Sequence, residues 1–211
     1  MRLRLHHALW LLSAVPLAAG AVRLLGLAGG AAPAAVDERF FQAPWPVAIH
    51  VMAAAVYAVL GALQFGGAQR SPLPPWHRAA GWAALAGGLA TGMTGIWMTL
   101  RYPIPAALQG DLLWAVRLAV GTGLCVALVL AVVAARARQW ALHRAWMVRA
   151  YAMAQGAGTQ VLLMLPVALV TGSDVLGLTR DVLMSCAWLL NLGVAEYAIR
   201  ARGAGPLAAR P

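Results

Sequence analysis

The stretch LLWAVRLAVGTGLCVALVLAVVA, residues 112–134, decides the class of fold. It contains a single charged side chain, Arg117, and is otherwise almost entirely apolar. Because an α-helix rises 1.5 Å per residue, about 20 apolar residues cross the ~30 Å hydrocarbon layer of a bilayer. The stretch therefore predicts a helix that spans a membrane.

Five further apolar runs of comparable length are bounded by charged residues, proline or glycine. Together with the first they predict six spans, at residues 8–27, 46–65, 78–100, 112–134, 146–170 and 182–200. The run at 8–27 has the small residues of a signal-peptide site near Ala18–Ala21, but we expect it to be a true first span. The sequence predicts an all-α polytopic bundle of six transmembrane helices, with residues 1–211 in a single membrane domain.

The composition agrees with this class of protein. Hydrophobic residues make up 62% of the chain and charged residues 10%, whereas soluble proteins are about half apolar and a quarter charged. The formal net charge is +10, and all 16 basic residues are arginines that mostly flank apolar runs. Membrane topology explains such arginines better than nucleic-acid binding does. We therefore expect the lipid bilayer, and no nucleic acid, as the partner.

The arginines also predict an orientation. If both termini are cytoplasmic, the cytoplasmic segments hold Arg2, Arg4, Arg70, Arg78, Arg136, Arg138, Arg144, Arg149, Arg200, Arg202 and Arg210. The outer segments then hold Asp37, Glu38, Asp111, Asp174 and Asp181. Since positive charge accumulates on the cytoplasmic side of membrane proteins, we expect a bacterial inner-membrane protein with residues 28–45 outside.

Small residues mark one face of the third predicted span. Gly81, Ala84, Gly88, Gly92 and Gly95 recur at spacings of three and four, which places them on one helical face. Such a face favours close packing of two helices or leaves a flat groove for a planar ligand. The sequence leaves both interpretations open.

Polar residues within the spans fall at two levels. His77 and His143 begin spans that start at the cytoplasmic side, whereas His50 lies one turn inside a span that starts outside. Helix rise separates these levels by roughly 20–25 Å, which excludes one metal site for all three histidines. Arg117 and Gln160 fall near the depth of His50. We therefore predict an inner site with two histidines and an outer polar layer around His50.

The inner site has the residues that a b-type haem needs. His77 and His143 would ligate the haem iron, and Gly81 would leave room for the ring. Three arginines are available for the propionates: Arg78, Arg144 and Arg149. Two alternatives remain, since the same pair could bind a quinone, and a His-Arg pair at a helix start also serves as an interfacial anchor.

Glu196 is the one acidic residue on the predicted inner side, near the end of the sixth span. An unpaired carboxylate is expensive at membrane depth, so we expect Glu196 to pair with Arg149. The pair would be a structural ion pair or take part in proton transfer.

Two functional hypotheses follow from these patterns. The first is a redox or electron-transfer component that binds haem b or quinol at the inner histidines. The second is a non-catalytic accessory or assembly subunit that packs against a larger membrane complex through its glycine faces. The sequence shows no hydrolase or transferase motif. A transporter is disfavoured because neither an inverted repeat nor paired broken helices are visible.

Four pieces of the sequence recur in one known family. They are the stripe from His50 to Arg70, His77-Arg78 with Gly81, the block HRAWMVRAYA at residues 143–152, and Asn191-Leu192 with Ala195-Glu196. On these pieces, over roughly residues 46–197, the chain resembles the uncharacterised bacterial multi-pass membrane family called domain of unknown function 2306. That family has no assigned activity, so the resemblance implies a fold and a choice of residues, and no reaction.

Overall fold

The computed structural model describes residues 5–30, 38–67 and 75–203, and every regular element among them is an α-helix. The helices are α1 (Leu5–Gly29), α2 (Glu38–Gln42), α3 (Pro44–Gly67), α4 (Trp76–Arg101), α5 (Asp111–Arg136), α6 (Trp140–Ala154), α7 (Gly156–Thr171) and α8 (Gly177–Gly203). Six stretches are long and apolar enough to cross a membrane, with α6 and α7 forming one of them. The predicted all-α fold with six spans is confirmed.

The observed helices are longer than the predicted spans. The fifth span was predicted to begin at residue 146 but begins at Trp140, because α6 carries His143, Arg144 and Arg149 within its helical turns. Long arginine side chains can reach the polar interface from inside a helix, so charge does not mark the helix start. The other spans begin one to five residues before their predicted starts.

The segment predicted to be non-helical between the first two spans contains a short helix, α2. Its aromatic residue Phe40 packs edge-to-face on Tyr102, with ring centroids 5.3 Å apart, which holds α2 against the end of α4. Some residues used in the orientation argument lie outside the described part of the chain: Arg2, Arg4, Asp37, Arg70 and Arg210.

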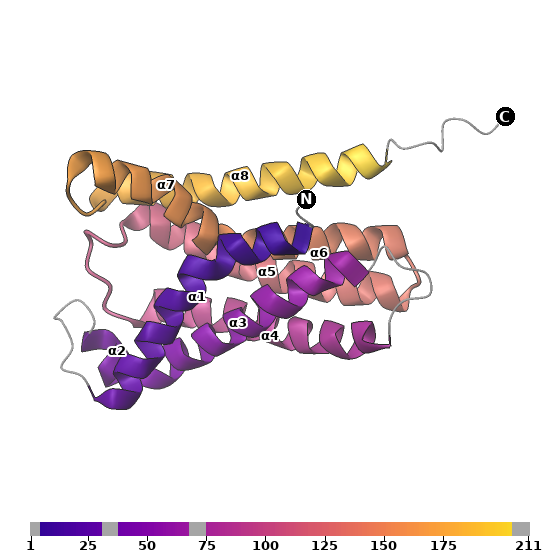
Figure 1. The fold of residues 1–211 in the computed structure, drawn as a ribbon, viewed down its shortest axis with the longest axis horizontal. Coiled ribbons are helices and arrows are strands. Elements are labelled where there is room, and N and C mark those ends of the chain that lie inside the picture. The colour runs from indigo at the N-terminus through magenta and orange to yellow at the C-terminus, as the bar shows by residue number, and fades with distance from the viewer. Residues whose placement is uncertain (1–4, 31–37, 68–74, 204–211) are drawn as a thin grey trace.

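The helices form an elongated bundle in which α3, α4, α5 and α6 pack as successive antiparallel neighbours (Figure 1). The helix α1 packs on α3 and α7, and α8 packs on α6 and α7. At one end of the bundle α1 begins and α8 ends, and we call this the termini end. The other end carries α2 and the loop of residues 102–110, and we call it the α2 end.

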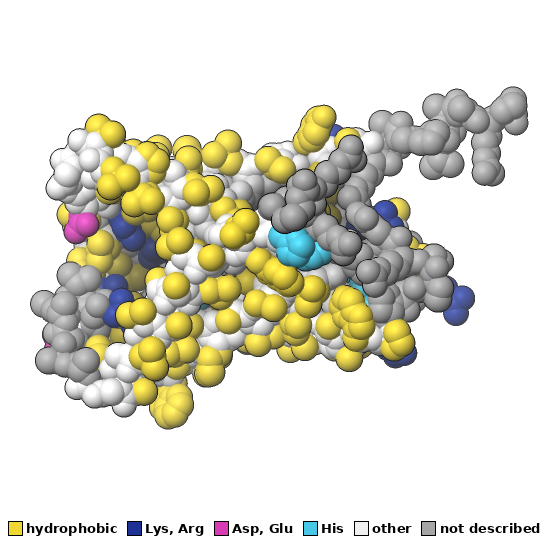
Figure 2. All heavy atoms as spheres, viewed as in Figure 1, with side chains coloured by type: hydrophobic (Ala, Val, Ile, Leu, Met, Phe, Trp, Pro, Cys, Tyr) yellow, Lys and Arg dark blue, Asp and Glu magenta, His cyan; other side chains and the backbone are white. Residues whose placement is uncertain are grey.

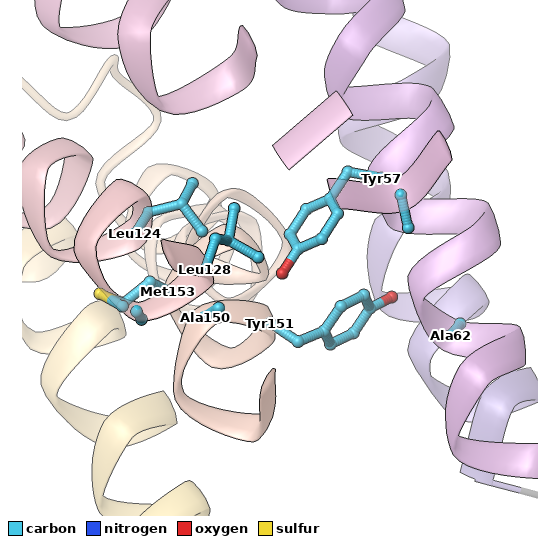
Figure 3. Packing of buried hydrophobic residues seen from close by; sticks show 9 residues of the cluster. Tyr57, Ala62, Leu124, Leu128, Ala150, Tyr151 and Met153 are labelled. Carbon is cyan, nitrogen blue, oxygen red and sulfur yellow. The ribbon is translucent and has the colours of Figure 1, made fainter. Parts of the chain in front are cut away.

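The centre of the bundle is built around two tyrosines (Figure 3). The rings of Tyr57 on α3 and Tyr151 on α6 lie with centroids 5.6 Å apart, and Leu128 of α5 is fully buried in the same cluster. Glycines of α4 permit this packing, because a Cβ at Gly88 would lie 2.7 Å from Leu128 Cδ1. The small-residue face of α4 therefore serves close helix packing at Gly88.

Candidate functional site

The fifth span, Trp140–Thr171, is broken near the middle of its length. The helix α6 ends at Ala154, α7 begins at Gly156, and Gln155 between them does not continue the α-helix. A break leaves backbone carbonyls without helical partners, which hydrocarbon cannot satisfy. Side chains of α8 supply the missing donors: Trp188 Nε1 donates to the Met153 carbonyl at 3.1 Å, and Asn191 Nδ2 donates to the Ala152 carbonyl at 3.2 Å.

Two glycines after the break allow other helices to come this close. A Cβ at Gly156 would clash with the indole ring of Trp188, and a Cβ at Gly158 would clash with the carbonyl of Leu12 on α1. The second clash is with backbone, which cannot turn away as a side chain can. The sequence Gln155-Gly156-Ala157-Gly158 therefore fixes where α1 and α8 contact α7.

Gln155 links three helices at the break. Its Oε1 accepts a hydrogen bond of 3.0 Å from Ser13 of α1, and its Nε2 donates to the Tyr151 hydroxyl at 2.8 Å. The Tyr151 hydroxyl in turn donates to the Ala58 carbonyl of α3 at 2.7 Å. Both Ser13 and Gln155 are buried. This network was not predicted, although a glutamine followed by two glycines inside an apolar run is a signal for it.

A cavity of about 360 Å³ opens between the break and the α2 end. Its larger polar side chains come from five helices and include Arg39, His50, Arg117, Gln160 and Arg180. Its deeper wall is apolar and includes Leu124, Met153 and Met184. We call this space the arginine cavity. Figure 2 shows arginine side chains recessed in a hollow at the left-hand, α2 end of an otherwise largely hydrophobic face.

Two arginines of the cavity, Arg117 and Arg180, donate hydrogen bonds to neutral oxygens. Arg117 Nη1 donates to the side-chain oxygen of Gln109, and Arg180 Nε donates to the Leu108 carbonyl at 3.2 Å. Both acceptors lie on the loop between α4 and α5. In the part of the chain that the structure describes, neither Arg117 nor Arg180 forms an ion pair. Arg39 stacks its guanidinium on Phe40, with 4.4 Å to the ring centroid.

The nearest buried carboxylate is already engaged. Asp181 is 2% exposed and accepts hydrogen bonds from the backbone N–H groups of Gly110, at 3.2 Å, and Leu113, at 3.4 Å. These donors lie at the start of α5, where the helix dipole also favours a negative charge. Asp181 therefore caps α5 and does not line the arginine cavity. Asp181 is still near enough to Arg117 and Arg180 to act on both electrostatically, and Asp174 acts on Arg180. Among the described residues, no acidic side chain lines the cavity itself, so Arg117 and Arg180 are charged groups that a ligand in it would meet.

Smaller polar contacts complete the cavity. His50 Nδ1 lies 3.0 Å from Thr94 Oγ1, and the imidazole ring lies over Gly95, where an added Cβ would make an ordinary contact of 3.5 Å with His50 Cε1. Tyr102, between α4 and α5, donates its hydroxyl to the Ala43 carbonyl at 2.6 Å. Burial raises the pKa of Tyr102, so this hydroxyl stays a donor at neutral pH.

The structure brings His50, Arg117 and Gln160 to one cavity, as helix rise predicted for the outer layer. Two further arginines of this cavity, Arg39 and Arg180, were missed by sequence reasoning. Both lie in the first turn of a helix, at the end of the bundle where the orientation argument expects few positive charges. Arginines at this unexpected end are the sequence signal that could have found them.

The inner histidines also lie near each other, at the termini end. His143 is close enough to His77 to act on it electrostatically, and its Nδ1 lies 2.9 Å from the Ala131 carbonyl. The side-chain amide of Gln64 covers His77, with its nitrogen 2.8 Å from Nδ1 and 3.2 Å from Nε2. Gly81 faces the same Gln64 side chain. A glutamine therefore occupies the space predicted for a planar ring.

Of the three arginines predicted to bind haem propionates, one is engaged in an ion pair and two are exposed. Arg149 forms an ion pair with Glu196, with 2.5 Å between Nε and Oε1 and 3.0 Å between Nη2 and Oε2. The guanidinium of Arg149 also stacks on Trp146. Arg78 and Arg144 are exposed. Within the described ranges, no three potential metal-ligating side chains gather at one point.

Comparison with known proteins gives one match. The sequence profile of a family described as "Predicted membrane protein (DUF2306)" matches residues 47–199. No curated protein and no solved structure matches the chain. The matched segment runs from α3 into α8, so it contains the broken span and nearly all of the arginine cavity, and it leaves out α1 and α2.

Proposed function

The chain belongs to the predicted membrane protein family DUF2306, and from the lining of its arginine cavity we propose that it binds an amphipathic anion there. The anionic head group would contact Arg117 and Arg180 at the α2 end. The apolar part of the ligand would lie deeper, against Leu124 and Met153.

The observation that carries this proposal is that Arg117 and Arg180, in two membrane spans, form no ion pair with any carboxylate among the described residues. Arg117 is the seventh residue of α5, so it lies roughly 9 Å along the helix from Asp111. An arginine at membrane depth costs about 2.5 to 3.5 kcal/mol on insertion scales, and such residues usually mark a functional site. The neutral oxygens of Gln109 and Leu108 solvate these charges. Asp181 acts electrostatically on both arginines and Asp174 on Arg180, but in the described part of the chain neither carboxylate forms an ion pair with them. An anion would neutralise them.

The shape of the cavity specifies the kind of anion. A volume of about 360 Å³ is within the range of small-molecule sites. Guanidinium groups present parallel N–H donors that match the oxygens of a carboxylate or phosphate. Because the inner wall is apolar, the ligand that fits has a charged head and a hydrocarbon or aromatic body.

Thermal unfolding of the purified protein in a neutral detergent tests this class of ligand. Dodecyl phosphate and dodecanoate should raise the unfolding temperature in proportion to the logarithm of their concentration, because they bind only the folded state. Dodecanol and dodecyltrimethylammonium, with the same alkyl chain, should not. Equal stabilisation by all four compounds would show that only the alkyl chain is recognised, and would overturn the proposal.

A redox role at the histidine pair is the second candidate, because His77 and His143 lie near each other as that hypothesis requires. The side chains do not fit a haem b between the two imidazoles, since the amide of Gln64 lies on both nitrogens of His77. A quinol needs one hydrogen bond in place of two iron–nitrogen bonds, so it would have to displace the Gln64 amide from only one nitrogen of His77. Solvent extraction of the purified protein should then yield quinone, and His77→Ala should remove it. Extracts without quinone would eliminate this candidate.

The accessory-subunit hypothesis was based on the glycine face of α4 as a docking surface, and part of that face is covered within the protein. At Gly88 a Cβ would lie 2.7 Å from Leu128 Cδ1 of α5, and at Gly92 it would lie 2.6 Å from Cys125 Sγ of α5. This part of the glycine face of α4 is therefore covered by helices of the same chain. It offers no surface to a larger membrane complex.

A further inference from the structure

A second cavity opens toward the termini end, on the other side of the helix break from the arginine cavity. It is a groove of about 500 Å³ between α1, α6 and α8. The helix α1 packs on α3 and α7 while α8 packs on α6 and α7, so the two helices border the groove from opposite sides (Figure 1). Its walls are mainly aliphatic and aromatic: Leu5, Leu9, Phe65, Val148, Val194 and Ile199. We call it the α1–α8 groove.

The polar groups in the deep part of the α1–α8 groove are satisfied within the protein. Gln155 is bonded to Ser13 and Tyr151. Asn191 donates to the Ala152 carbonyl and accepts from Thr159 at 2.8 Å. These groups do not require a polar ligand. The deep part of the groove therefore suits a hydrocarbon chain.

One charged residue lines the groove, and it lies near the mouth. Arg144 is exposed, near the start of α6, and among the described residues it makes no hydrogen bond or ion pair. Gln155, at the deep end, is 11 residues further along the chain, so the groove extends roughly 16 Å along the helix axis. That is about half of the ~30 Å hydrocarbon core, the depth of one leaflet.

Positive charge is also in excess around the mouth of the groove. Glu196 is the acidic residue of the described helices near this end, and it is paired with Arg149. Four more arginines lie at helix ends or in the adjoining loop at the same end: Arg78, Arg136, Arg138 and Arg200. A cluster of arginines beside a membrane attracts anionic lipid headgroups.

We propose that the α1–α8 groove holds one anionic phospholipid of the adjacent leaflet. An acyl chain lies between α1, α6 and α8, and the lipid phosphate contacts Arg144. This site is independent of the proposed function, because its residues and its end of the bundle are different. A membrane lipid fits this groove because its apolar walls are as long as one leaflet is deep. At the mouth of the groove lies Arg144, which has no partner among the described residues.

Native mass spectrometry of the full-length protein from nanodiscs tests the site, with phosphatidylglycerol and phosphatidylcholine present in equal parts. The wild-type protein should retain one phosphatidylglycerol. Arg144→Gln should lower its retention about tenfold, the loss expected for one charge-assisted contact. Ala198→Trp, at an exposed position of the groove wall, should displace the lipid without overpacking the buried core.

Two matched variants control for charge and for bulk. Arg136→Gln removes an exposed arginine at the same end that does not line the groove, and Leu189→Trp adds an indole to an exposed face of α8. Both should retain the lipid. Equal retention of the two phospholipids by the wild-type protein, or equal losses in Arg136→Gln and Arg144→Gln, would overturn the proposal. So would retention of a quinone in place of the lipid.

Discussion

The indole Nε1 of Trp188 on α8 donates a hydrogen bond of 3.1 Å to the carbonyl oxygen of Met153 on α6. Both residues line the arginine cavity. The interaction that satisfies the broken backbone therefore also builds the floor of the candidate site. A broken span inside a membrane is stable only when such a partner or a cavity satisfies its backbone, and here both are present.

Loss of that donor should destabilise the protein. Trp188→Phe keeps an aromatic ring but leaves the Met153 carbonyl without its partner, which costs about 1 to 3 kcal/mol for a buried group. Thermal unfolding in detergent measures the change. Trp114→Phe, at a half-exposed tryptophan that lines neither cavity, should unfold like the wild type. Equal stability of the two variants would mean that the indole N–H is not required at the break.

Gly158 lies where α1 packs closely on α7, whereas Gly193 lies on an open surface of α8. Gly158→Ala should lower the free energy of unfolding by about 1 to 3 kcal/mol, because the added methyl clashes with the Leu12 backbone and forces α1 away from α7. Gly193→Ala, in the middle of α8 with nothing within 4 Å of its Cβ, should be neutral or stabilising. The same melting experiment compares them. A neutral Gly158→Ala would show that α1 does not pack as described.

The Arg149–Glu196 ion pair predicts a rescue. Arg149→Glu and Glu196→Arg should each destabilise the bundle by about 1 to 3 kcal/mol, since each places two like charges side by side between α6 and α8. The double variant restores opposite charges and should recover most of the loss, as unfolding of the purified proteins would reveal. If the two losses add in the double variant, the pair makes no net contribution to stability.

Much of the fold could be predicted from the sequence, because the length of an apolar run is enough to define a span. Helix rise alone also placed His50 and Arg117 at one level and His77 and His143 at another. The pairing of Arg149 with Glu196 followed from the scarcity of acidic residues on that side. These inferences depend on local pattern or on simple counting.

The helix break could not be predicted in the same way, because it depends on tertiary contacts. No proline lies at Gln155, and the donors Trp188 and Asn191 come from more than 30 residues further along the chain. The contribution of Arg39 and Arg180 to the cavity was missed for the same reason. They reach it only through the placement of α2 and of the first turn of α8.

The orientation in the membrane is a prediction of arginine distribution that cysteine labelling can check. In a background with Cys125 and Cys186 replaced by alanine, Ala137→Cys lies in the loop after α5 and Ala106→Cys in the loop after α4. A membrane-impermeant maleimide added to intact cells should label only Ala106→Cys, because that loop lies at the α2 end, opposite the arginine-rich termini end. Labelling of Ala137→Cys alone would reverse the orientation.

The central claim is that Arg117 and Arg180 bind the head group of an amphipathic anion, and the affinity for dodecyl phosphate tests it most directly. In isothermal titration in neutral detergent, the single variants Arg117→Gln and Arg180→Gln should each raise the dissociation constant at least about tenfold over the wild type. Loss of a charge-assisted hydrogen bond predicts this weakening. Arg101→Gln, at an exposed arginine of the same end outside the cavity, should bind like the wild type. Equal affinities in all four proteins, or equal weakening in Arg101→Gln, would contradict the account.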